Sequence, residues 1–211
     1  SSPSLNIVVL GMMFTLFPVD FGIFKILFTG LFLLVILPTL VYLINGEKEE
    51  ITPDFFLKEN ISWKMALQEI FPQLLKNLFL ILKTTLPFMI LSGFLGSLIV
   101  EIFPLENLAH LTLNLKSLFL IALVGTLLPV PISFDLVVTF ILMNLGLPIG
   151  LCFTLFFTLG IYSIYPMLII WRDISFKLAI GIFFTVMLTG ILGGLALHGF
   201  NSYLFQKTEN L

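Results

Sequence analysis

The sequence predicts an all-α integral membrane protein, organised as a polytopic helix bundle. Hydrophobic residues make up 59% of the 211 residues and charged residues only 10%, and the mean hydropathy is +1.15. Soluble domains carry about 25% charged residues, so this composition excludes an ordinary soluble domain. The net charge of −2 gives no indication of nucleic acid as a partner, and the single cysteine excludes a disulfide framework within the chain.

The first 45 residues are predicted to end a first transmembrane repeat. Leu5 to Phe17 is apolar but too short to cross ~30 Å of hydrocarbon as a helix. Phe21 to Ile44 is long enough to span, and we expect Lys25, near its start, to extend its amine to the membrane interface. The chain opens on Ser1 without a signal segment, so we expect further helices upstream or on a partner subunit.

The rest of the chain is predicted to form a charged loop, a second repeat and a polar tail. Its segments are a loop at 46–60, an amphipathic interface helix at 61–82, a span at 84–103, a broken hairpin at 117–147, spans at 148–171 and 175–198, and a tail at 199–211. Lysines are concentrated before the span at 84–103. The positive-inside rule therefore places 46–83 in the cytoplasm.

The segment 117–147 carries the candidate site. Pro129 and Pro131 each interrupt a helix, and Ser133 and Asp135 follow directly. Asp135 is the only charge between Lys116 and Arg172. Non-helical backbone survives at membrane depth only where protein or a wet cavity surrounds it, and carboxylates there usually mark functional sites. The alternative is a kinked transmembrane helix with Asp135 near an interface.

The positive charges also favour a re-entrant hairpin bent at Pro129–Pro131. If 117–147 entered and returned on one side, Arg172 and Lys177 would lie in the cytoplasm, as the positive-inside rule prefers. In that topology the spans that begin near Phe24-Lys25 and Phe176-Lys177 start on opposite faces of the membrane. An inverted repeat would place them in this way, and transporters commonly bind their substrates where such repeats meet.

This order of features resembles the predicted-permease family that includes the ArsP-type organoarsenical exporters. Residues 72–198 are similar to the second half of that family, and Ser2-Pro3-Ser4-Leu5-Asn6 resembles the element that closes its first half. The resemblance implies half of an inverted-repeat permease, with Asn6 as a further site residue. The family's broken segment often contains cysteine before a proline, whereas residues 129–135 contain none. Export of soft arsenicals, which need thiolate ligands, is therefore not expected from this half.

Two functional hypotheses follow. In the first, the protein is a secondary transporter of a small solute or ion, with Asp135, Ser133, Pro129, Pro131 and Asn6 forming the site. In the second, it is a non-transporting scaffold or accessory subunit of a larger membrane complex. We expect no enzymatic activity, because the chain has no paired intramembrane carboxylates, His-Glu metal motif or Ser-Lys arrangement. An ATP-driven pump is not expected either, because no Gly-rich nucleotide loop with a following lysine occurs. We also expect no cofactor and no metal site. The expected partners are the lipid bilayer and membrane subunits, in a homo- or hetero-oligomer without nucleic acid. The expected location is a cell membrane, specifically a bacterial inner membrane.

Overall fold

The computed structural model describes residues 7–45, 111–130 and 134–209, together with isolated helical positions between 74 and 101. Throughout this part of the chain the regular structure is helical, with no strands. The helices are α1 (Ile7–Leu16), α2 (Val19–Leu31), the π-helical turn η2 (Phe32–Ile36), α3 (Leu37–Asn45), α6 (Leu115–Leu127), α7 (Phe134–Asn144), α8 (Ile149–Ile161), α9 (Ile164–Asp173) and α10 (Phe176–Glu209). The prediction of an all-helical chain is confirmed for these residues.

Local sequence explains where several helices begin. Pro18 and Pro148 directly precede α2 and α8, and proline separates helices because it lacks a backbone donor. Asn114 precedes α6, and its side chain accepts a hydrogen bond of 2.8 Å from the Ser117 amide, which satisfies one of the free donors of the first turn. Before α8 the chain turns at Gly146, whose φ of +101° favours glycine.

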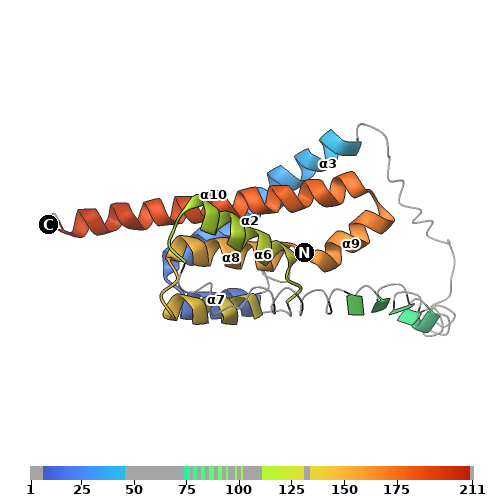
Figure 1. Cartoon of the computed structure of the whole chain (residues 1–211), viewed down its shortest axis with the longest axis horizontal. Coiled ribbons are helices and arrows are strands. Elements are labelled where there is room, and N and C mark those ends of the chain that lie inside the picture. Colours follow the sequence, from blue (N-terminus) through green and yellow to red (C-terminus); the bar gives the residue numbers. More distant parts are fainter. Residues whose placement is uncertain are drawn as a thin grey trace, which may run out of the picture.

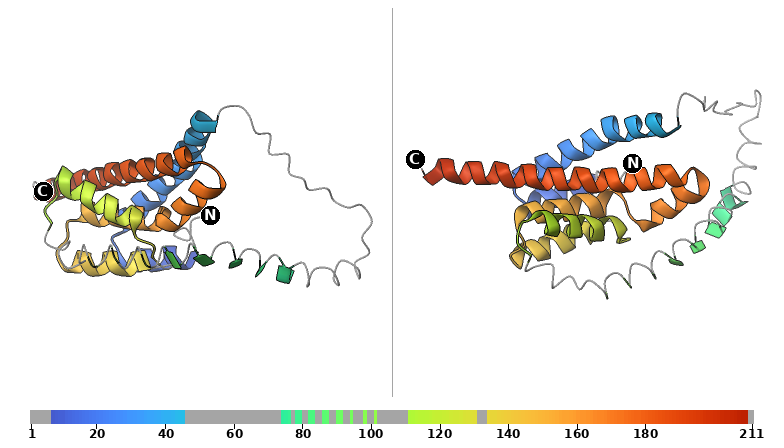
Figure 2. Two further views of the ribbon diagram at one scale, coloured as in Figure 1. Left: turned by 45° about the vertical axis from the view of Figure 1, so that its right-hand side comes forward. Right: turned by 45° about the horizontal axis from the view of Figure 1, so that its top comes forward.

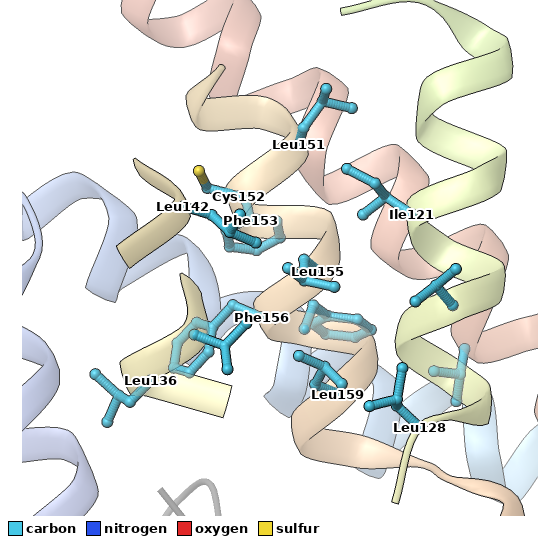
Figure 3. Packing of buried hydrophobic residues seen from close by; sticks show 14 of the residues in the cluster. Ile121, Leu128, Leu136, Leu142, Leu151, Cys152, Phe153, Leu155, Phe156 and Leu159 are labelled. Atoms are coloured by element: carbon cyan, nitrogen blue, oxygen red, sulfur yellow. The ribbon is translucent and has the colours of Figure 1, made fainter. Parts of the chain in front are cut away.

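Helix α8 occupies the centre of the bundle. Each of its residues from Gly150 to Leu159 is buried, and it packs against α6, α7, α10 and α2. Figure 3 shows its Leu155 and Phe156 between Ile121 of α6 and the following Leu128 on one side and Leu136 of α7 on the other. A helix that is apolar on all sides is expected to lie in the interior, and α8 does so.

Two described helices are long and apolar enough to cross a membrane. One runs from Val19 to Ile44 through α2, η2 and α3, and the other is Phe176–Leu204 within α10 (Figures 1 and 2). Helices α8 and α9 count as a third when taken together, although they are bent by 41°. This bend divides the single span predicted at 148–171, because Tyr162 and Ser163 have extended backbone.

Of the other predicted spans, one agrees with the described helices and one ends earlier than the helix that contains it. The span predicted at Phe21–Ile44 coincides with the continuous helix Val19–Ile44. Helix α10 continues to Glu209, past residue 198, where the last span was predicted to end. Its C-terminal part extends beyond the other described helices (Figure 1). The predicted loop 46–60 and most of the predicted interface helix 61–82 and span 84–103 lie outside the described residues.

Glycines allow α8 and α10 to approach closely. A Cβ at Gly194 of α10 would collide with the Thr154 hydroxyl and the Gly150 carbonyl oxygen of α8. The Thr154 hydroxyl bonds across this contact to the carbonyl of Gly190, at 3.1 Å. Small residues at a helix contact bring backbones together where apolar solvent supplies no hydrophobic driving force.

We therefore expect Gly194→Ala to destabilise the protein by about 1–3 kcal/mol, the usual cost of overpacking. The matched control is Gly199→Ala in the same helix, where a Cβ meets nothing within 4 Å and alanine gains up to about 1 kcal/mol of helix propensity. Unfolding in mixed micelles measures both changes. Equal stability of the two variants would contradict the close contact.

Candidate functional site

Lys25 of α2 lies inside the bundle. Its exposed fraction is 0%, and its amine donates a hydrogen bond of 3.0 Å to the Phe156 carbonyl oxygen of α8. The amine nitrogen also lies 4.2 Å from the centroid of the Phe156 ring and 5.3 Å from that of Phe157, close enough for cation–π attraction. The prediction that Lys25 extends to the membrane interface is therefore wrong, because packing against α8 holds the side chain in the protein.

Asp135 is the buried counterpart of this lysine. It lies in the first turn of α7 and is only 4% exposed. The two groups interact electrostatically, but within the described chain the only direct ion pair joins Arg172 and Asp173. An isolated buried charge is very costly, so charges in protein interiors occur with opposite partners. Lys25 and Asp135 together keep this region of the interior close to electrically neutral.

Two threonine hydroxyls without partners accompany the two charges. Thr29 follows Lys25 by one helical turn and Thr139 follows Asp135 by one turn, and both residues are 0% exposed. Among the described residues, these are the buried side-chain oxygens that lack a hydrogen-bond partner. Other buried threonines bond to helix carbonyls, as Thr126 does to Ala122 at 2.7 Å. Burying a hydroxyl without a partner costs about 1–3 kcal/mol, so these two threonines stand out among the buried polar groups of the described chain.

The break between α6 and α7 lies beside the same part of α8. Helix α6 ends at Leu127, and α7 begins at Phe134. A Cβ at Gly125, close to the end of α6, would touch the Thr158 side chain of α8. The end of α6, the start of α7 and the lysine of α2 therefore meet around the C-terminal half of α8.

The predicted site is thus described in part. Asp135 is buried and Pro129 is half-buried in the break. Pro131, Ser133 and Asn6 lie outside the described residues. The structure adds Lys25, Thr29 and Thr139, which the sequence reasoning did not include.

One sequence signal points to Lys25. It is the only charged residue between Asp20 and Glu47, just as Asp135 is the only charge between Lys116 and Arg172. Two long apolar stretches thus each contain a single charge, and the two charges have opposite signs. Because lipid strongly disfavours isolated charges, such a pair indicates a contact between two helices.

The remaining reactive groups are separate from this cluster. The thiol of Cys152 is buried and donates to the Leu147 carbonyl, at 3.3 Å. Within the described chain no three His, Cys, Asp or Glu side chains are grouped so that they hold a metal ion.

The described part of the chain is thus all-helical, and two of its helices, or three if α8 and α9 count as one span, are long and apolar enough to cross a membrane. Comparison with family models, curated proteins and solved structures gives no significant match for this chain. The resemblance to the permease family therefore stays a prediction.

Proposed function

We propose that this protein is a permease-like membrane protein that carries a small solute or ion by secondary transport. The observation that carries the proposal is the burial of Lys25 and Asp135, two opposite charges from different helices, beside a break in the chain. Ionisable residues inside membrane bundles are rare, and they line ion paths and proton relays. We infer that the site lies where α2 and the start of α7 meet α8.

The short helices support a re-entrant hairpin. At 1.5 Å per residue, the 13 residues of α6 and the 11 of α7 reach roughly 20 Å and 17 Å, less than the ~30 Å of the hydrocarbon core. Helix α6 runs parallel to α8, since Leu113 lies near Gly150 and Thr158 near Gly125. Helix α7 runs in the opposite direction before the chain turns into α8 (Figure 1). The chain thus reverses at the break, as a re-entrant segment does.

Matched helix lengths support an inverted repeat. Helices α1 and α9 each contain 10 residues, and a two-residue link leads from each into a long helix. The short helices start at residues 7 and 164 and the long ones at 19 and 176, a constant offset of 157 (164 − 7 and 176 − 19). The long helices are antiparallel, because Gly181 lies near Leu40 and Gly193 near Phe28.

This offset differs from the 152 positions that separate Phe24-Lys25 from Phe176-Lys177. With an offset of 157, Lys25 and Lys177 do not occupy equivalent positions in the two repeats. Their environments differ accordingly, since Lys25 is buried and Lys177 is exposed. We propose that the repeat is built from the α1–α3 and α9–α10 units.

The second candidate function is an accessory subunit of a larger membrane complex. The observation that favours it is the exposed apolar face of Val19–Ile44: only 11% of an 18-residue apolar window of this helix is buried, compared with 50% for the corresponding window of Phe176–Leu204 in α10. Such a surface fits lipid or a partner helix. In this case we expect no water to reach Asp135.

Cysteine labelling distinguishes the two functions. In a Cys152→Ser background, cysteines placed at positions 133 and 135 are exposed to a membrane-impermeant thiol reagent from each side. Controls are Leu142→Cys, which is buried in α7, and Val137→Cys, which is 45% exposed on its outer face. Transport predicts labelling at 133 or 135 from one side that changes with pH, and none at either control. No reaction at 133 and 135 from either side would favour the accessory subunit.

A further inference from the structure

The electrostatic balance of the buried pair limits what it can bind. Lys25 and Asp135, when both are charged, sum to zero. A proton or a sodium ion added alone to Asp135 leaves one uncompensated positive charge among fully buried side chains. Because the desolvation of a single charge costs several kcal/mol, a ligand set that restores neutrality is strongly favoured.

We propose that Lys25 and Asp135 form a site that binds a small monovalent anion together with a proton. The proton neutralises Asp135, and the anion then becomes the counter-ion of Lys25. The inference rests on the proposed transport site and assigns its ligand. The only covalent change is the O–H bond of the Asp135 carboxyl, which forms when the proton binds and breaks when the proton leaves with the anion.

Donors for such an anion are present. An ammonium group has three N–H donors, and one of them is used for the Phe156 carbonyl. The unpaired hydroxyls of Thr29 and Thr139 lie one turn along their helices from Lys25 and Asp135. Charge-assisted hydrogen bonds from an ammonium are roughly twice as strong as neutral ones. Lys25 thus offers an anion one positive charge, and the same two helices carry two hydroxyls without a protein partner.

Other titratable groups on the surrounding helices lie elsewhere in the bundle. Helix α1 contains none. On α2, Asp20 is in the first turn and partly exposed. On α6, Lys116 is exposed at the end opposite the break. On α8, the Cys152 thiol bonds to the Leu147 carbonyl, and the following Tyr162 hydroxyl donates to the Ala179 carbonyl.

Helices α9 and α10 do not supply a competing charge. The ion pair of Arg172 and Asp173 is exposed, and so is Lys177. His198 lies beside Gly150, at the other end of α8 from Phe156. Within the described chain, the charges of this cluster are therefore those of Lys25 and Asp135.

The test measures binding before transport. Thermal unfolding of the purified protein in detergent is followed with sodium chloride or sodium nitrate, with sodium gluconate at equal ionic strength as the reference. We expect chloride or nitrate to raise the Tm in acidic buffer and to have a much smaller effect in alkaline buffer. A Tm that responds to sodium but not to the anion, or that is independent of both, would overturn the proposal.

Variants assign the response to the cluster. Lys25→Met should abolish the anion-dependent shift in Tm, and the double variant with Lys25→Met and Asp135→Asn, which keeps the interior neutral, should fold and also show none. Lys177→Met removes an exposed lysine and should respond like the unaltered protein. An anion response that persists in the double variant would overturn the assignment.

Proteoliposomes separate this inference from the proposed function. With a pH-sensitive dye inside, an inward chloride or nitrate gradient should drive proton uptake without moving net charge. Anion binding without any flux would contradict transport but support the site. Proton flux that is independent of the anion would support transport and contradict the proposed ligand.

Discussion

Replacing Lys25 with methionine alone is expected to lower the free energy of unfolding by about 3–5 kcal/mol, the usual cost of removing one partner of a buried charge pair. The change leaves the Asp135 carboxylate uncompensated in the interior. It also removes the hydrogen bond to the Phe156 carbonyl. Reversible unfolding in mixed micelles measures the loss.

The double replacement of Lys25 with methionine and Asp135 with leucine should recover most of this stability. Apolar residues of similar volume often replace a buried ion pair without loss. The matched control is Lys177→Met, which removes an exposed lysine from α10 and should change stability by less than about 0.5 kcal/mol. If the effects of the two single replacements simply add in the double variant, the two charges do not act as a pair.

Opposite pH dependences should accompany the two single variants. In Lys25→Met, acid protonates the remaining carboxylate and removes the uncompensated charge, so the loss of stability should shrink as the pH falls. In Asp135→Asn, the remaining amine is neutralised by deprotonation, so the loss should shrink as the pH rises. Losses that do not depend on pH would contradict a charge-pair explanation.

The second large effect concerns Phe156, where three segments of the chain meet. This side chain is 0% exposed. Its ring stacks on Phe17 and on Phe21, with centroid distances of 5.7 Å in both cases, and Lys25 lies over it. We expect Phe156→Ala to cost about 3 kcal/mol, through the cavity it leaves and the dispersion contacts it removes.

The control for this change is Phe119→Ala on α6, where the side chain is 54% exposed. It should cost less than about 1 kcal/mol, since few protein contacts are lost. Comparable destabilisation by both variants would show that Phe156 is not a centre of packing. Because Phe156→Ala keeps the backbone carbonyl, the hydrogen bond from Lys25 should remain.

Some features of the fold could be predicted because their causes are local. The high apolar content and the scarcity of charge predict a helical membrane protein. Prolines mark the starts of α2 and α8. The chain is also interrupted after Leu127, directly before Pro129, as the sequence predicts. Asp135 could be singled out because it is the only charge in a long apolar stretch.

The break between α8 and α9 was not predicted. The sequence from 148 to 171 is apolar enough for one span, and hydropathy alone does not distinguish a straight helix from one bent by 41°. Near Pro166, the residues Tyr162 and Ser163 adopt extended backbone. The Tyr162 hydroxyl bonds to Ala179 of α10, at 3.1 Å, so a contact with a distant helix accompanies the break.

By itself, then, the sequence indicated a helical membrane protein, the starts of α2 and α8 and the isolated charge of Asp135, because composition and proline act locally. Only the tertiary structure decided the role of Lys25. The same side chain extends to water when its helix faces lipid at the interface, and becomes a buried counter-ion when its helix packs on α8. Which of these occurs depends on contacts with residues more than a hundred positions away, so tertiary packing brought Lys25 and Asp135 into one electrostatic cluster.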